Sequence, residues 1–202
     1  MYGCNRLSLV NMAIVDQYRV VPVAGCGPEI GASLWTLEEA RRRTLAYVEN
    51  IGQEALDYDP PGQRHGVATL LYHIAVFEVD WVYNDILGGG YDMERRIPKC
   101  PPEVAQHLPY PLLTEEMDYT PVSEESLDIH LARLAYIREA VLEILTAMSL
   151  KEFRTLRPTE DAPVTPEWVV EHLAQHEAEH RGQIWEARVS AEKSLGQRNS
   201  PE

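Results

Sequence analysis

The sequence predicts an all-α protein built as a four-helix bundle. Four stretches carry apolar residues at helical spacing, and no stretch alternates apolar and polar residues as a half-buried strand does. Amphipathic helices bury their apolar stripes against one another. A long proline-rich segment separates the second stretch from the third, which fits the crossover connection that some bundles contain.

The first expected helix begins at Thr36, which forms a capping-box pattern with Glu39. Apolar residues recur from Leu37 to Ile51, and the charged residues of 41–43 are expected on the opposite face. Gly52 marks the end of this helix. We expect residues 1–32 to form an N-terminal arm, extended or partly ordered, and residues 33–202 to form the bundle.

The second expected helix runs from Val67 to Leu87 and is apolar over much of its circumference, which suits a bundle interior. The glycines of 88–90 end it. The link that follows, to Val122, contains six prolines and no sustained period. Its tyrosines, Tyr91, Tyr110 and Tyr119, either cover a pocket or pin the link to the body, and pinning is the simpler prediction.

The third expected helix starts near Ser123, a suitable cap, and its apolar stripe extends from Leu127 to Met148, with His130 at the edge. The fourth starts with Thr165 as N-cap and Pro166 in the first position. We expect it to end at Gly196.

The fourth helix carries a row of three histidines, His172, His176 and His180, at four-residue steps. Residues i and i+4 share one helix face, so His176 and His180 can direct two imidazoles at one metal ion. Such a pair is often ordinary polar surface. Here Val169, Leu173 and Ile184 share the histidine face, and an unpaired imidazole facing a core is costly. Metal binding is therefore the favoured interpretation.

The third ligand is expected from another helix, because bundle metal sites are assembled from facing helices. His73 is the best candidate, since a lone histidine in the apolar second helix otherwise lacks a reason. His65 and His107 are less well placed. Three neutral imidazoles leave positions open for water or substrate, as in catalytic zinc sites, and nickel and iron accept the same ligands.

Composition narrows the class of partner. The chain has 202 residues and a net charge of -14, which argues against nucleic acid and anionic membranes as partners. No stretch approaches the roughly 20 apolar residues of a membrane span. Three widely spaced cysteines give no disulfide framework. Reduced thiols fit a cytoplasmic protein, so we expect that location.

One resemblance is more specific. His73 with Trp81 in the second helix, followed by the run His176-Glu-Ala-Glu-His-Arg-Gly-Gln-Ile184, resembles the DinB/YfiT-like superfamily of metal-binding bundles across residues 33–195. The resemblance implies an up-down-down-up bundle, with the long crossover between helices 2 and 3, and often a homodimer. It also implies zinc or nickel on His73, His176 and His180.

Characterised relatives resemble thiol-dependent transferases and isomerases, so the resemblance implies a small-molecule transferase or hydrolase with a low-molecular-weight thiol as cosubstrate. Whether this chain is an enzyme stays open, and no catalytic residue is assigned. His172 is interpreted as supporting the ligands from outside the coordination sphere, and Asp80 as orienting a ligand imidazole.

Two alternatives remain open. The first is a bundle that binds a metal or a small ligand without catalysis, or that keeps its histidines for structure alone. The second, more remote, is a zinc protease, because His176 to His180 also satisfies H-E-x-x-H. That motif needs Glu177 as a base, yet Glu177 points about 100° away from His176. We expect Glu177 at the surface or behind the ligands.

Overall fold

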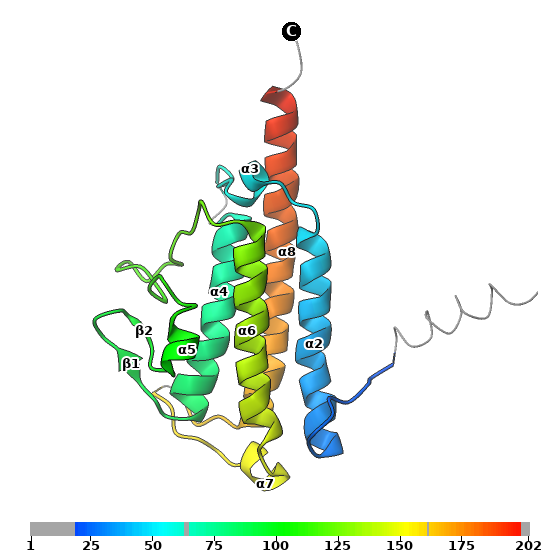
Figure 1. The fold of residues 1–202 in the computed structure, drawn as a ribbon, viewed down its shortest axis with the longest axis vertical. Coiled ribbons are helices and arrows are strands. Elements are labelled where there is room, and N and C mark those ends of the chain that lie inside the picture. Colours follow the sequence, from blue (N-terminus) through cyan, green and yellow to red (C-terminus); the bar gives the residue numbers. More distant parts are fainter. Residues whose placement is uncertain (1–18, 63–64, 161, 199–202) are drawn as a thin grey trace, which may run out of the picture.

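A computed structural model describes residues 19–62, 65–160 and 162–198. Its longest helical segments lie side by side (Figure 1), and the all-α prediction is confirmed. These segments are α2 (Pro28–Val48), α4 (Val67–Val79) with its π-helical continuation η1 (Asp80–Ile86), α6 (Leu127–Thr146) and α8 (Pro166–Arg198). Shorter helices lie between them: α3 (Gln53–Leu56), α5 (Pro102–Ala105) and α7 (Leu150–Phe153).

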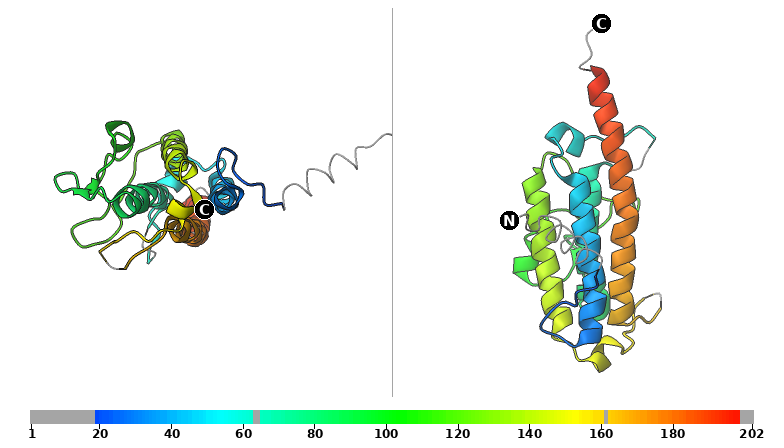
Figure 2. Two further views of the ribbon diagram at one scale, coloured as in Figure 1. Left: turned by 90° about the horizontal axis from the view of Figure 1, so that it is seen from below. Right: turned by 90° about the vertical axis from the view of Figure 1, so that its right-hand side faces the viewer.

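Helix α4 lies at the centre of the core. It packs against both α6 and α8, while α2 packs along α8. Every residue of α4 except Phe77 is buried, as its nearly continuous apolar sequence predicts. The C-terminal end of α8 extends past the other long helices (Figure 2). Among the described residues, no helix combines the length and the apolar character that crossing a bilayer requires.

Four buried charges tie the long helices together. Arg41 on α2 donates to Glu177 on α8 at 2.8 Å and to Glu78 on α4 at 2.6 Å. Arg138 on α6 donates to Glu177 at 3.1 Å and also binds Glu78. All four residues are at most 7% exposed. The two cations balance the two anions, which is the condition under which burying ions is tolerated.

The first helix starts earlier than predicted. Helix α2 begins at Pro28, so the capping box at Thr36 is wrong. The Thr36 hydroxyl donates to the Ser33 carbonyl at 2.6 Å, and Glu39 pairs with arginines on its own helix. Proline has a fixed φ close to the helical value and is favoured at the first helical position. This preference explains why α2 begins at Pro28.

The segment before α2 folds back onto that helix. The Val23 N–H donates to the Gly31 carbonyl at 2.9 Å, and a Cβ on Gly31 would lie 2.5 Å from the Val23 oxygen. Glycine is therefore required for this close approach. Residues 28–32 of the expected arm belong to α2, and its residues 1–18 lie outside the described residues.

Two other boundaries also moved. Ser126, not Ser123, caps α6, and its hydroxyl accepts from the Ile129 N–H at 3.4 Å. The start of α8 was correct, since Thr165 accepts from the Trp168 N–H at 3.1 Å and Pro166 is the first residue. Gly196 does not end α8, which continues to Arg198.

The proline-rich link is more structured than its sequence indicated. It contains a short antiparallel pair, β1 (Tyr91–Asp92) with β2 (Ile97–Pro98), and helix α5. The link is attached to the bundle by hydrogen bonds: Thr69 accepts from the Val122 N–H at 3.0 Å, and Arg133 donates to the His107 carbonyl at 2.8 Å. These contacts place the link over the α4 and α6 side of the molecule.

Candidate metal centre

Three histidines from two helices converge at the α4–α8 interface. His73 comes from α4, and His176 and His180 come from successive turns of α8. The His176 Nε2 atom lies 3.1 Å from Nε2 of His73 and 3.0 Å from Nε2 of His180. One nitrogen from each ring lies within 4.8 Å of the others. His73 and His180 are buried, and His176 is half-buried.

Gln183 fixes the tautomer of His180. The amide oxygen of Gln183 lies 2.8 Å from His180 Nδ1, and an amide oxygen only accepts, so Nδ1 carries the proton. The Nε2 atom of the neutral ring then presents its lone pair to the cluster. This is the arrangement of a metal-ligating histidine whose second nitrogen is held by a hydrogen bond.

Aromatic rings hold His73 in place. Its Nδ1 atom has no hydrogen-bond partner among the described residues. The ring instead stacks on Tyr119, with centroids 3.6 Å apart, and contacts Phe77 at 4.1 Å. Tyr119 also stacks on His65 at 4.3 Å. Tyr119 therefore covers the histidine cluster as well as attaching the link to the bundle.

The three imidazoles are neutral at physiological pH. Burial lowers the pKa of His73 to about 2, and the other imidazoles add to this effect. Burial and the neighbouring His180 lower the pKa of His176 to about 3. Burial also lowers the pKa of His180. Neutral imidazole is the form that binds a metal ion.

The donor set fits a divalent transition metal. A neutral imidazole has a single N–H, so His176 can donate from Nε2 to only one of its two close neighbours. One ion shared by all three lone pairs removes this conflict. Zinc, nickel and iron accept such nitrogen ligands, and three protein ligands leave positions for water or substrate.

Comparison with known families agrees with this geometry. The sequence profile of the DinB superfamily matches residues 36–184, which include all three histidines. The chain belongs to the DinB superfamily. Members of this superfamily are generally metal-binding, and the resemblance drawn from the histidine motif is confirmed. A search against curated proteins gave no match.

Two further residues expected near the DinB site, His172 and Asp80, lie outside the three-histidine cluster. His172 stacks on Trp168 with centroids 4.9 Å apart and contacts Trp81 at 4.6 Å. Asp80 accepts from the Tyr91 hydroxyl at 2.7 Å. Among the described residues, Asp80 makes no hydrogen bond to His73, His176 or His180, so its role in orienting a ligand imidazole stays a prediction.

The other histidines do not join the cluster. His65 lies 3.2 Å from an Asp118 oxygen, and His107 stacks on Tyr136. His130 is fully buried beside Arg133, so its assignment to a helix edge is wrong. These positions agree with the choice of His73 as the third member.

Glu177 has a structural place that the sequence did not indicate. It is 1% exposed, so of the two expected positions the surface one is wrong. One carboxylate oxygen accepts from Arg41 and the other from Arg138. Because both oxygens of this buried carboxylate accept from guanidinium groups, it is not placed to accept a proton at the histidine cluster. This removes the residue that the zinc protease alternative requires.

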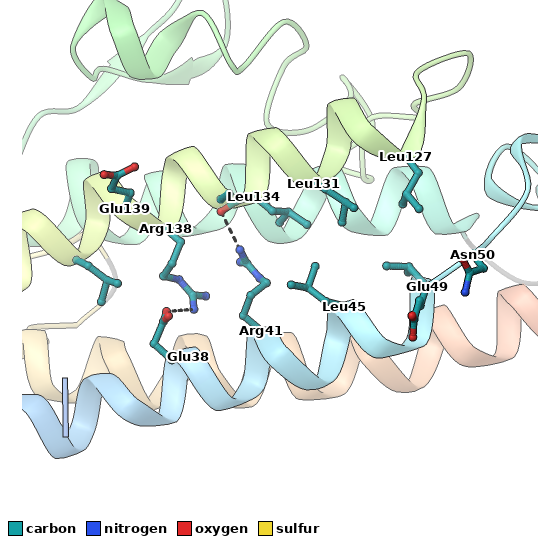
Figure 3. A pocket seen from close by; sticks show the side chains of 13 residues that line it. Glu38, Arg41, Leu45, Glu49, Asn50, Leu127, Leu131, Leu134, Arg138 and Glu139 are labelled. Carbon is teal, nitrogen blue, oxygen red and sulfur yellow. Dashed lines mark hydrogen bonds and ion pairs between the residues drawn. The ribbon is translucent and has the colours of Figure 1, made fainter. Parts of the chain in front are cut away.

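The structure also contains a pocket that is not lined by the clustered histidines. It measures about 680 Å³ and lies between α2 and α6, lined by leucines, by Arg41 and Arg138, and by Glu38 and Glu139 (Figure 3). The two arginines already bind Glu78 and Glu177. Size alone therefore does not make this pocket the reactive site, because none of the three clustered histidines is among its described lining residues.

Acid is expected to destabilise the metal-free bundle in part through His73. An unfolded histidine titrates near pH 6.5, whereas burial holds folded His73 neutral down to a pKa of about 2. The unfolded state then binds the extra proton, so the free energy of unfolding falls by about 1.4 kcal/mol per pH unit below about pH 6.5. His73→Phe is expected to show a shallower slope in urea unfolding with a chelator between about pH 6 and 4. Equal slopes would contradict a buried neutral imidazole.

Proposed function

We propose that this DinB-superfamily chain is a divalent-metal-dependent enzyme that acts on a small molecule, as a thiol-dependent transferase or a hydrolase. The observation that carries the proposal is the convergence of three Nε2 atoms from α4 and α8. His73, His176 and His180 would hold zinc or nickel. When bound, the ion lowers the pKa of a coordinated thiol or water, so that a nucleophile is available near neutral pH.

The protein groups around the ligands have distinct roles in this proposal. Gln183 keeps His180 in the tautomer that offers Nε2. Tyr119 and Phe77 pack against the ring of His73 and hold this buried ligand in place. A low-dielectric surrounding strengthens electrostatic interactions within a site.

In the transferase reaction, the sulfur of a low-molecular-weight thiol forms a bond to an electrophilic carbon of the substrate. The leaving group departs with its electron pair, and the thiol proton passes to solvent. In the hydrolase reaction, water takes the place of the thiol. Both reactions use the same ligands and differ in the nucleophile, so the response to added thiol separates them.

Cobalt(II) provides a test, because it replaces zinc in nitrogen sites and absorbs light. Protein loaded with cobalt is expected to gain a near-ultraviolet sulfur-to-metal band when 2-mercaptoethanol is added, and no such band with ethylene glycol. His176→Ala is expected to lose both the cobalt spectrum and the thiol response. Cobalt binding without any response to thiol would remove the transferase, and turnover assays with ester and amide substrates would then separate a hydrolase from a non-catalytic binding bundle.

Two further properties are proposed from the family. The four long helices take the up-down-down-up order with a crossover between the second and the third. The chain forms a homodimer, which its mass in solution decides.

A further inference from the structure

The histidine cluster is one end of a continuous row of rings between α4 and α8. On α4 and η1, rings recur at four-residue spacing, as His73, Phe77 and Trp81. A matching row runs along α8, formed by Trp168, His172, His176 and His180. The rings meet across the seam: Phe77 stacks on His176 with centroids 5.3 Å apart, and Trp81 lies 5.5 Å from Trp168. His172 contacts both tryptophans, with ring centroids 4.6 Å from Trp81 and 4.9 Å from Trp168. The seam therefore leads away from the metal ligands along the helix axes.

A pocket of about 300 Å³ lies at the far end of this seam. Phe77, Trp81 and Trp168 provide aromatic lining. Phe77 also contacts His73 and His176, so a single ring separates the pocket from the cluster. The pocket is large enough for part of a small molecule.

The polar side of the pocket is built on η1, the π-helical continuation of α4. Asp80, the first residue of η1, is 8% exposed and borders the pocket. Its Oδ1 atom accepts from the Tyr91 hydroxyl at 2.7 Å, and Asn84 donates to the same hydroxyl at 3.2 Å. Within the described part of the chain, Oδ2 of Asp80 has no hydrogen-bond donor. Segments of π-helix inside α-helices are frequent at functional sites.

Three of the described side chains that line the pocket are carboxylates. Asp80, Asp85 and Glu160 line it, and no lysine, arginine or histidine is among the described lining residues. Burial, the hydrogen bond to Asp80 and the three carboxylates together raise the pKa of Tyr91 above its usual range. A buried carboxylate without a cation is unfavourable, and burial raises the pKa of Asp80 to about 6. Electron-rich faces of tryptophan add a second preference for positive charge.

We propose that this pocket binds the positively charged amino or quaternary ammonium group of a small-molecule substrate whose reacting end lies at the histidine cluster. The position of the reacting end rests on the proposed function. Asp80 follows His73 by seven residues, so at about 1.5 Å per residue the two sites are separated by about 10 Å along the helix. The substrate therefore carries its cation about 10 Å from the reacting atom.

Binding of choline, compared with its uncharged carbon analogue 3,3-dimethyl-1-butanol, tests this pocket in the full chain. Calorimetry is expected to show choline binding at least 10-fold tighter than the neutral analogue. Asp80→Asn keeps the shape of the side chain and removes its charge, and it is expected to weaken choline binding at least 10-fold. Asp128→Asn, at an exposed position of α6, is the matched control and is expected to bind choline as the wild type does.

Equal affinity for choline and the neutral analogue would overturn the proposal, and the wild-type comparison decides this even if Asp80→Asn does not fold. Equal choline binding by folded Asp80→Asn and wild type would overturn it as well. Metal content is measured in the same samples. Charge-selective binding without metal would contradict the proposed function alone, whereas bound metal without charge selectivity would contradict the pocket alone.

Discussion

Replacing His176 with alanine is expected to abolish metal binding by this chain. His176 Nε2 lies between the other two ligand atoms, 3.1 Å from His73 and 3.0 Å from His180, so its loss breaks the cluster at its centre. Loss of even a hydrogen-bond partner of a ligand costs about 10–100-fold in affinity, so we expect more than about 100-fold here. His73→Ala is expected to behave in the same way, because it removes the contribution of α4.

Elemental analysis of protein purified without a histidine tag measures this effect. The wild type is expected to contain one zinc or nickel ion per chain, and both variants none. His172→Ala is the matched control, because His172 shares the helix face but lies outside the cluster. Metal retained in His73→Ala but lost in His176→Ala would contradict a site that joins α4 to α8.

The second large effect is expected from Glu177→Gln. This change removes one charge from a cluster in which Arg41 and Arg138 each bind both Glu78 and Glu177. Burial opposes ionisation of Glu78, but the two arginines outweigh it and lower the pKa of its carboxyl. Without Glu177, two buried guanidinium groups share one anion. Removing one partner from a buried ion pair costs about 3–5 kcal/mol, so a loss of about 3 kcal/mol or more in unfolding free energy is expected.

Urea unfolding of wild type and variant, both metal-free, measures this loss. The matched control is Glu167→Gln, which removes a charge from the exposed ion pair of Arg154 and Glu167, 3.0 Å apart. Exposed pairs contribute about 0–1 kcal/mol, so this control is expected to unfold nearly as the wild type does. A loss below about 1 kcal/mol in Glu177→Gln would show that the buried network does not stabilise the bundle.

The cluster itself could be predicted because its signals are local. His176 and His180 are four residues apart, so helix geometry alone places both on the same face of α8. His73 stood out because it is the single histidine in a helix that is otherwise strongly apolar. Helical periodicity predicted the all-α architecture, and the capping pattern of Thr165 and Pro166 predicted the start of α8.

The features that could not be predicted depend on contacts between distant parts of the chain. Arg41 was expected on an outer face, because helical periodicity treats a charge as exposed unless a partner is known. Its partner Glu177 is 136 residues away in sequence. Tyr119 reaches His73 from a link without periodicity, and the π-helical turn at Asp80 has no signature in residue order.

Anomalous X-ray scattering tests most directly whether His73, His176 and His180 hold one divalent metal ion, as we propose. Diffraction data on crystals of the untagged protein, collected on both sides of the zinc and nickel absorption edges, would locate the metal and identify it. We expect one anomalous peak about 2.0–2.1 Å from the Nε2 atoms of all three histidines. A peak on His172 or on the acidic pocket instead, or no peak after soaking with zinc and nickel, would contradict the claim.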